Sequence, residues 1–410
     1  MKLLKILALV VATSAYAQSG DEAIKELNRK INILADEIEA LKTNQTQITD
    51  NEALTVYGLG RSGSKVYKID KGVSIGGYGE VIYKNKRSEL QNGQKSSGGT
   101  NPVSDALRNV IYVGYKFNQN WVFNSEIEIE HADEVFAEFA YLDYLHSDAL
   151  NARFGLILAP MGFINELHEA TTFLSVNRPD IESKIIPSTW RENGLGIFGS
   201  KAGFEYRLYL MNGLNAASFT SDGVRGGRKK GTTAESGDLA WTGRLDYVGM
   251  SNLLVGVSAY VGSASGTASK VDHNIYDFHL DYKIKGIQTR FLYVHSTVDA
   301  EKLNQDLGLT GSNGVGEELT GWYWEVGYNV LHNFNTNNKL IPFARYETYD
   351  TQAEASTGLT RDASKERENI TLGLVYQPIE RISFKFDYII GKNEAETGTD
   401  SWNLGMGWNF

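Results

Sequence analysis

The chain has 410 residues, a formal net charge of −10 and no cysteine. The absence of cysteine excludes disulfides, thiolate metal sites and attachment of a lipid to a cysteine. A net acidic chain without long basic tracts is a poor binder of nucleic acid, so we expect no nucleic-acid partner.

Residues 1–17 have the pattern of a secretory signal peptide. Lys2 and Lys5 precede an apolar run over residues 6–12, and the small-x-small sequence of residues 15–17 fits a cleavage site. The apolar run is too short to cross a bilayer as a helix. We therefore expect export from the cytoplasm and removal of this segment.

Residues 18–50 carry apolar side chains at alternating spacings of three and four, which predicts a coiled coil. An isolated helix of this length is marginal in water, so the pattern predicts self-association. It leaves open whether two or three chains associate, and a single amphipathic helix packed on the chain's own barrel is an alternative. The expected seam consists of Ile24, Leu27, Ile31, Leu34, Ile38 and Leu41.

Residues 51–72 are expected to form a polar linker that contains several glycines. Within it, residues 55–59 are a candidate for a short extra strand or a plug element.

Residues 73–410 alternate polar and apolar side chains in segments of about ten residues, which predicts an all-β transmembrane barrel of about sixteen antiparallel strands. Short turns alternate with longer loops, as expected for an outer-membrane barrel with both termini in the periplasm. A soluble β-sandwich is the alternative. The strands are expected to begin near Val73, Leu107, Asn120, Glu134, Leu150, Gly194, Gly203, Asp238, Asn252, Asp272, Gly286, Leu319, Lys339, Lys365, Arg381 and Gly398.

The alternation separates charged from aromatic side chains, as lipid on one side of a barrel wall and water on the other would require. Along one strand, for example, Asp277 and His279 alternate with Phe278. One exception is visible, because Asp143 shares its face with the aromatic residue Tyr141. A β-bulge or a position at the rim would account for it.

Three segments carry a resemblance to a known family: residues 73–80 (VSIGGYGE), 153–163 (RFGLILAPMGF) and 190–197 (WRENGLGI). They are similar to segments of the phosphate-selective (O/P-type) porins and of their trimeric relatives that bear a coiled coil. The resemblance implies a homotrimeric diffusion porin of the Gram-negative outer membrane, with its third long loop folded into the lumen. Some members of the family favour phosphate or small carboxylates through inward arginines and lysines.

The long connection over residues 160–193 occupies the place of that third loop. It is too long for a surface turn, and its apolar residues indicate that it packs against the barrel. Loop charges facing wall charges of opposite sign would create a transverse field across the pore. Candidate residues of the pore lining and constriction are Glu126, Glu128, Glu130, Arg153, Arg178, Lys184, Arg191, Glu192, Arg207, Arg244, Arg290 and Arg345.

The charge of the expected lumen argues against phosphate specificity. Glu126, Glu128 and Glu130 lie on one inward face and would repel anions, so a nearly unselective or weakly cation-preferring pore is expected. A basic cluster over residues 225–230 falls in an external loop, where it would gather anions, bind lipopolysaccharide phosphates or simply be solvated.

The chain is expected to be a channel and not an enzyme. Its histidines are scattered and belong to no nucleophile motif. His279, with Asp277 and Asp281 on the same face, has a spacing that suits a metal ion or an ordinary ion-pair ladder, and the ladder is favoured, so we expect no cofactor or metal. Besides other copies of itself, the expected partners are outer-membrane lipid, lipopolysaccharide and small hydrophilic solutes. The alternative function is a structural anchor that tethers the outer membrane to the cell wall through the coiled coil.

Overall fold

The computed structural model describes residues 25, 29–30, 56–96 and 101–410. The chain divides into two units, residues 1–53 and residues 54–410. In the first unit the three described residues are helical. The predicted signal peptide and the seam of the predicted coiled coil lie outside the described residues.

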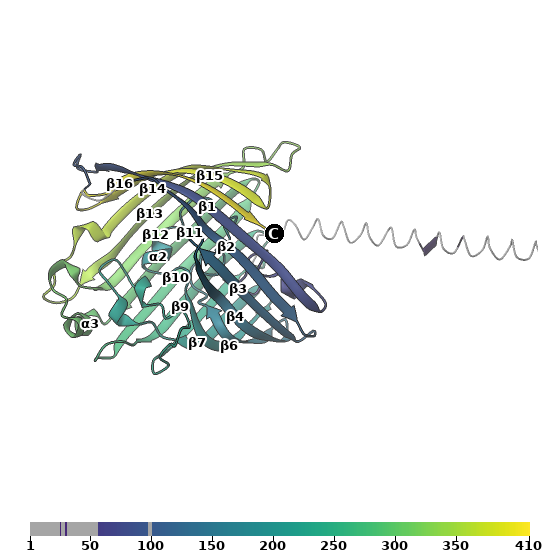
Figure 1. Cartoon of the computed structure of the whole chain (residues 1–410), viewed down its shortest axis with the longest axis horizontal. Helices are drawn as coiled ribbons and strands as arrows, with labels where there is room; N and C mark the ends of the chain where they lie inside the picture. The colour runs from purple at the N-terminus through teal and green to yellow at the C-terminus, as the bar shows by residue number, and fades with distance from the viewer. Residues whose placement is uncertain (1–24, 26–28, 31–55, 97–100) are drawn as a thin grey trace, which may run out of the picture. The chain divides into compact units, whose positions relative to one another are not determined.

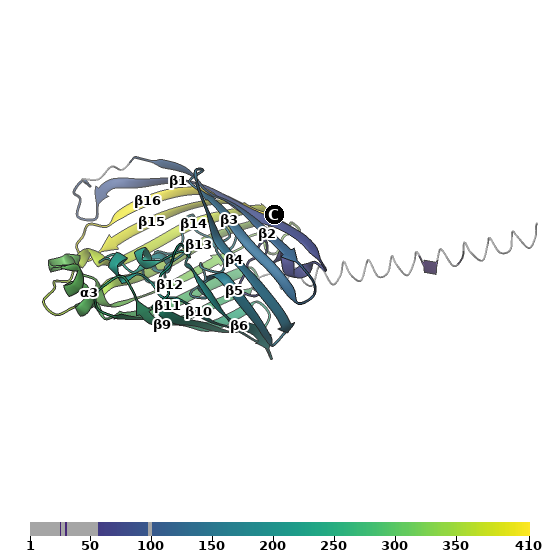
Figure 2. The ribbon, with the colours of Figure 1, turned by 60° about the horizontal axis from the view of Figure 1, so that its bottom comes forward.

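The second unit is a closed barrel of sixteen antiparallel strands (Figure 1, Figure 2). Each strand pairs with its neighbours in the sequence, and β1 pairs with β16 to close the sheet. The strands are β1 (Gly72–Leu90), β2 (Val103–Lys116), β3 (Trp121–Glu130), β4 (Glu134–Ser147), β5 (Leu150–Leu158), β6 (Arg191–Lys201), β7 (Phe204–Asn212), β8 (Leu239–Tyr247), β9 (Leu253–Ala264), β10 (Val271–Ile284), β11 (Ile287–Val298), β12 (Gly316–Tyr328), β13 (Lys339–Ala355), β14 (Glu366–Ile379), β15 (Ile382–Asn393) and β16 (Thr399–Asn409).

The prediction of sixteen antiparallel strands is confirmed. The largest difference in a strand's first residue is at β2, which begins at Val103 where Leu107 was expected. Short helices occupy the connections, and among the described residues no helix has the length and apolar character needed to cross a membrane. They are η1 (Lys65–Lys68), α2 (Ile181–Lys184), η2 (Ala216–Ser218), η3 (Arg225–Gly227), α3 (Ala300–Leu307), η4 (Gly311–Asn313) and η5 (Ala363–Lys365).

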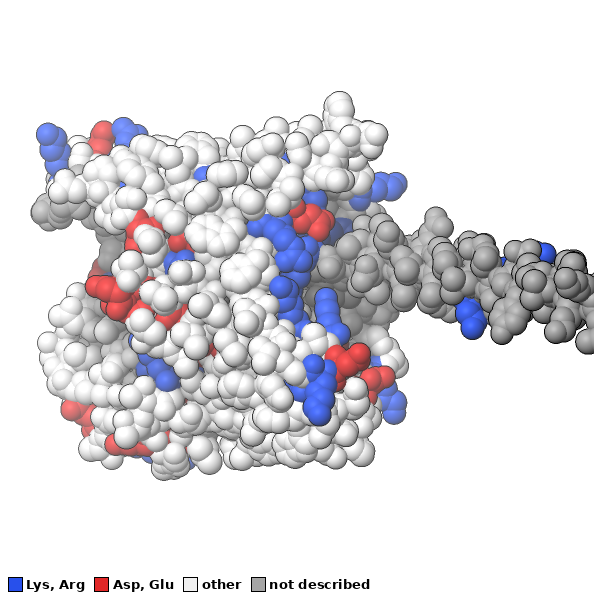
Figure 3. Space-filling view, turned by 45° about the vertical axis from the view of Figure 1, so that its right-hand side comes forward, with Lys and Arg blue, Asp and Glu red and all other residues white. Residues whose placement is uncertain are grey.

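The outer wall of the barrel is apolar and the inner wall is polar. On β10, Phe278 is 40% exposed on the outside, whereas His279 on the inside is fully buried. Trp241 and Leu195 are likewise exposed on the outer face. Figure 3 shows a face with wide uncharged areas, whose acidic and basic side chains gather toward the two ends of the barrel. So large an apolar surface on a folded protein is suited to contact with lipid.

A β-bulge in β4 corrects one expectation. The pairing of β3 with β4 shifts between Glu126, opposite Phe139, and Ile127, opposite Ala137, which leaves Glu138 as an extra residue. Beyond this bulge Phe139, Tyr141 and Asp143 all face the lumen and are buried. The expectation that the aromatic side chains here face lipid is therefore wrong, because the bulge reverses the parity of the strand.

Candidate functional site

The connection between β5 and β6, residues 159–190 and called loop 3 below, folds into the barrel. Its backbone N–H groups donate to carboxylates of the inner wall: Gly162 to Asp277 at 3.0 Å, and Val176 to Asp387 at 2.6 Å. The N–H of Ile181, the first residue of α2, donates to a wall carboxylate in the same way. Wall carboxylates thus hold the loop at three separate strands.

Glu182 of α2 holds the two arms of loop 3 together. Its Oε2 atom accepts hydrogen bonds from the N–H groups of Phe163 and Ile164, at 2.6 and 2.7 Å. Its Oε1 atom accepts one from the Tyr323 hydroxyl on β12 at 2.7 Å. Gly162 precedes this contact with a φ of 60°, and a Cβ atom there would lie 2.6 Å from Oε2. Glycine is required at this position both by its φ and by the closeness of the carboxylate.

Asp246 on β8 is the centre of a buried charge cluster. It accepts hydrogen bonds from Arg207 at 2.7 Å and from Arg244 at 2.8 Å, and it lies 2.7 Å from His279 Nε2. The other ring nitrogen of His279 lies 2.6 Å from Asp277, which also receives the Gly162 N–H of loop 3. Arg207 and Arg244, two candidate pore-lining residues, are therefore paired both with this wall carboxylate and with Glu166 of loop 3, at 2.8 and 3.8 Å.

The expected role of His279 in an ion-pair ladder holds, with one change of partner. Asp281 pairs instead with Arg290 at 2.7 Å, and Asp246 takes its place beside the imidazole. Among the described residues, no group of three His, Cys, Asp or Glu side chains is arranged to hold a metal ion.

The three inward glutamates of β3 have cationic or imidazole partners. Arg108 on β2 lies 2.8 Å from Glu128 and 3.6 Å from Glu130, and also 3.3 Å from Glu80 on β1. Glu126 lies 3.0 Å from His168 Nε2 of loop 3. Sequence reasoning overlooked Arg108, although it lies on the inward parity of β2 and directly opposite Glu130 in the register.

The other candidate residues are also placed by specific contacts. Arg153 pairs with Asp143 at 2.9 Å, Arg191 with Glu138 at 2.6 Å, and Arg345 with Glu325 at 3.4 Å. Glu192 accepts the backbone N–H of Lys229 at 2.7 Å. Lys184 lies in α2, where its carbonyl accepts the N–H of Val224 from the connection between β7 and β8. These residues are spread over several strands and over loop 3.

The basic cluster of residues 225–230 is partly structural. The Arg228 guanidinium donates to the carbonyl of Ser188 at 2.6 Å, and that of Arg225 donates to the Thr189 hydroxyl at 3.2 Å. Burial and then the nearby Arg225 lower the pKa of Arg228 to about 10. Two of its four cations, Arg225 and Arg228, thus secure the end of loop 3, whereas a solvated loop or a binding site for anions or lipopolysaccharide phosphates was expected.

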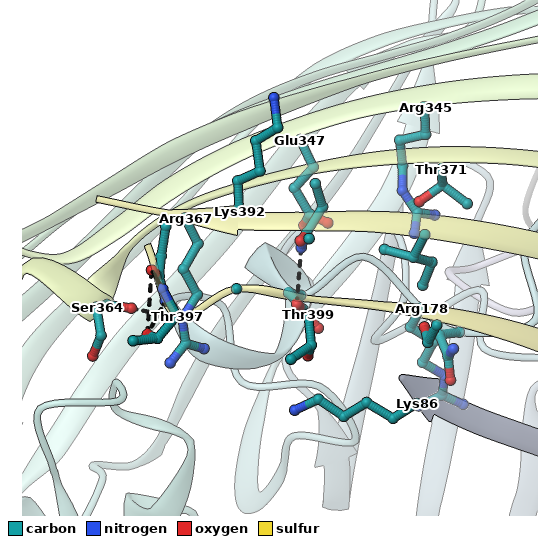
Figure 4. Close-up of a pocket in the computed structure, with 18 residues that line it drawn as sticks. Lys86, Arg178, Arg345, Glu347, Ser364, Arg367, Thr371, Lys392, Thr397 and Thr399 are labelled. Atoms are coloured by element: carbon teal, nitrogen blue, oxygen red, sulfur yellow. Dashed lines mark hydrogen bonds between the residues drawn. The ribbon is translucent and has the colours of Figure 1, made fainter. Parts of the chain in front are cut away.

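A cavity of about 420 Å³ lies between loop 3 and the inner wall formed by β13 to β16 and the end of β1 (Figure 4). Five of its lining side chains are cationic and two, Asp180 and Glu347, are acidic. Among the described residues, no carboxylate lies within salt-bridge distance of Arg178 or Lys86. The guanidinium of Arg178 donates a hydrogen bond of 3.3 Å to the carbonyl of His168. The cationic side chains are Lys86, Arg178, Arg345, Arg367 and Lys392.

No family model matches the chain. It is 37% identical over 384 residues to an uncharacterized protein of Aquifex aeolicus (strain VF5), which covers 89% of this chain and 86% of that protein. The chain belongs to the family of this Aquifex protein.

Several solved structures share the fold of this member of the Aquifex family. They include the outer membrane channel DcaP of Acinetobacter baumannii (TM-score 0.54, 11% identity, 83% of this chain and 98% of that chain). An anion-selective porin from Comamonas acidovorans (TM-score 0.52, 12% identity, 83% and 100%) and the trimer form of OmpT from Vibrio cholerae (TM-score 0.52, 11% identity, 83% and 100%) are also similar. The chain therefore has a porin-like outer-membrane β-barrel fold. Membership of the phosphate-selective family stays a prediction.

Proposed function

We propose that the protein is an outer-membrane porin that lets small hydrophilic solutes diffuse passively across the membrane. The observation that carries this proposal is a polar cavity of about 420 Å³ enclosed by a closed barrel with an apolar outer wall. A barrel of sixteen strands is wide enough to leave an aqueous channel, even when a loop narrows it.

We further propose that the channel prefers anions. The acids that were expected to repel anions are occupied by Arg108 and His168. In the cavity, by contrast, Arg345, Arg367 and Lys392 are paired with carboxylates, but Arg178 and Lys86 have no carboxylate within salt-bridge distance among the described residues and keep their charge available to solutes. Fixed charges at a narrow section of a pore set its ion selectivity, so the free cations of the cavity should outweigh the paired acids.

The proposal extends to the N-terminal residues and to the oligomeric state. Residues 1–17 would be removed as a signal peptide, and residues 18–50 would form a periplasmic coiled coil that joins chains into a homotrimer. The trimer form of OmpT, which shares this fold, supports that oligomeric state. The outer wall would contact lipid, and the external loops would face lipopolysaccharide.

Reversing two charges in the cavity tests the proposed preference for anions over cations. Wild-type protein in a planar bilayer with a salt gradient should give a reversal potential of the sign that marks anions as the more permeable ion. The double variant R178E/K86E turns five cations and two acids into three cations and four acids, so the reversal potential should change sign.

The matched control is K302E, because Lys302 is an exposed residue of α3 outside the lumen. If R178E/K86E and K302E give the same permeability ratio as the wild type, the cavity does not set selectivity.

A tether between outer membrane and cell wall is the second candidate function. The observation in its favour is how much of the inner wall loop 3 covers, from Glu126 on β3 to Asn409 on β16. A barrel that inserts into bilayers but never conducts would favour the tether.

A further inference from the structure

Residues 56–71, called the N-terminal segment below, carry our further inference. We propose that this segment is a second constriction element inside the barrel and that, together with loop 3, it sets the largest solute that passes. The inference rests on the proposed channel function and adds to it the element that limits solute size.

The N-terminal segment is packed against the inner wall. The Tyr67 hydroxyl donates to Asp143 on β4 at 2.6 Å, and Asn124 on β3 donates to the carbonyl of Gly63 at 2.9 Å. Leu59 and Val66 are 3% and 1% exposed. A solvated linker would leave such side chains in water, so this segment has a docked position.

The wall contacts of the segment continue across neighbouring strands. Lys116 on β2 donates to the carbonyl of Tyr67, and Arg153 on β5 to that of Tyr57. The Tyr57 ring lies against Phe198 on β6, with centroids 5.0 Å apart. The segment therefore covers the inner face of β2 to β6.

Loop 3 holds the segment from its other side. Glu169 Oε1 accepts the N–H groups of Ser62 and Gly63, at 2.9 and 3.3 Å. Gly58 has a φ of 83°, and a Cβ atom there would lie 2.2 Å from the Glu166 carboxylate of loop 3. Only glycine fits that combination of backbone conformation and close approach. Glu169 of loop 3 thus accepts backbone N–H groups of the segment, and Gly58 of the segment leaves room for the Glu166 carboxylate of the loop.

Most wall contacts of the segment come from strands that do not line the cavity; its further contacts are with the start of β1, beside Gly76, and with Glu380 in the turn between β14 and β15, which Arg61 pairs with at 3.1 Å. The cavity is lined by β1, by β13 to β16 and by loop 3, whereas the wall contacts described above come from β2 to β6. Loop 3 lies against both. Removing the segment should therefore open a cross-section beside β2 to β6 that loop 3 alone does not fill.

The test replaces residues 56–71 in the full-length chain with a glycine-serine linker of equal length, which keeps the chain connected on both sides. Single-channel conductance and the swelling of liposomes in sugars of increasing size are then measured. We expect conductance to rise on the order of two-fold, because an unobstructed sixteen-strand lumen is an aqueous channel. We also expect entry of sugars that the wild type excludes.

A point variant keeps the test independent of the linker's folding. E169A removes the acceptor of the Ser62 and Gly63 N–H groups. It also removes one of the two acceptors that loop 3 offers to Asn409 on β16, and the other, Thr171, stays in place. The variant should raise conductance and the size limit in the same direction by a smaller amount. E301A on α3 is the matched control, since Glu301 is exposed outside the lumen. Heat-modifiable migration on a gel confirms that each variant forms a barrel.

The outcomes separate the two proposals. Folded variants that keep the wild-type conductance and size limit would overturn the role of the segment and leave the porin intact. If the linker variant fails to fold, E169A decides by the same criterion. If the wild type does not conduct but the linker variant does, the segment blocks the lumen completely. If neither the wild type nor any variant conducts, the channel function is refuted, and this inference with it.

Discussion

Replacing Asp246 with alanine should destabilise the barrel by about 3–5 kcal/mol, since removing one partner of a buried ion pair leaves uncompensated charge. Arg207, Arg244 and His279 all lose their shared carboxylate in this variant. The measurement is the urea or temperature midpoint at which the heat-modifiable gel form is lost. Because Asp277 connects the cluster to Gly162, loop 3 should also loosen and the conductance should become noisier.

D272A is the control for this prediction. Asp272 lies on the same strand as His279, but it is exposed, and within the described part of the chain its side chain accepts a hydrogen bond from the Ser263 hydroxyl alone. Equal losses of stability in D246A and D272A would mean that the Asp246 cluster contributes no more to the stability of the barrel than an exposed aspartate does.

The second large effect is expected for R108A. This change leaves Glu80, Glu128 and Glu130 without their common guanidinium. Three freed carboxylates should lower stability by several kcal/mol, and they should shift the reversal potential toward cations. Both quantities are measured on the same purified protein, by urea unfolding and in a salt gradient.

R87A serves as the comparison, because Arg87 is half exposed and its ion pairs lie in solvent, where such pairs contribute little. The double variant R108A/E128Q should recover part of the stability, since it removes one of the freed charges. A permeability ratio that stays the same in R108A would separate these glutamates from the ion pathway.

The fold was predictable because each strand repeats a local rule. Residues such as Asp277, Phe278 and His279 show which face meets lipid, without knowledge of any other strand. The prediction failed at Phe139 and Tyr141, where the extra residue Glu138 reverses the parity. The break in parity at Asp143 did indicate a β-bulge or a rim position, and the bulge is present. Its place along the strand is decided by how two strands pair, so the sequence left open which residues it turns inward.

The inward direction of the β3 glutamates was predictable, but their electrostatic partners were not. Glu126 and Glu128 do lie on the inner wall, but their effect depends on His168 and Arg108, which come from loop 3 and from a neighbouring strand. Partners that are brought together by the folding of a long loop leave no periodic signal. The docking of residues 56–71 was hidden for the same reason, although residues 55–59 were considered as a plug.

The seam between β1 and β16 has a consequence for assembly. Its partners, such as Tyr78 and Asn409, are separated by nearly the whole described chain, so the seam is the contact with the greatest entropic cost of ring closure. Loop 3 and residues 56–71 are both enclosed once β1 and β16 have paired. During assembly, loop 3 and residues 56–71 must therefore reach their positions before the barrel closes, or enter through the open end of the barrel afterwards. In a chain whose last strand pairs late, both segments would stay accessible to proteases.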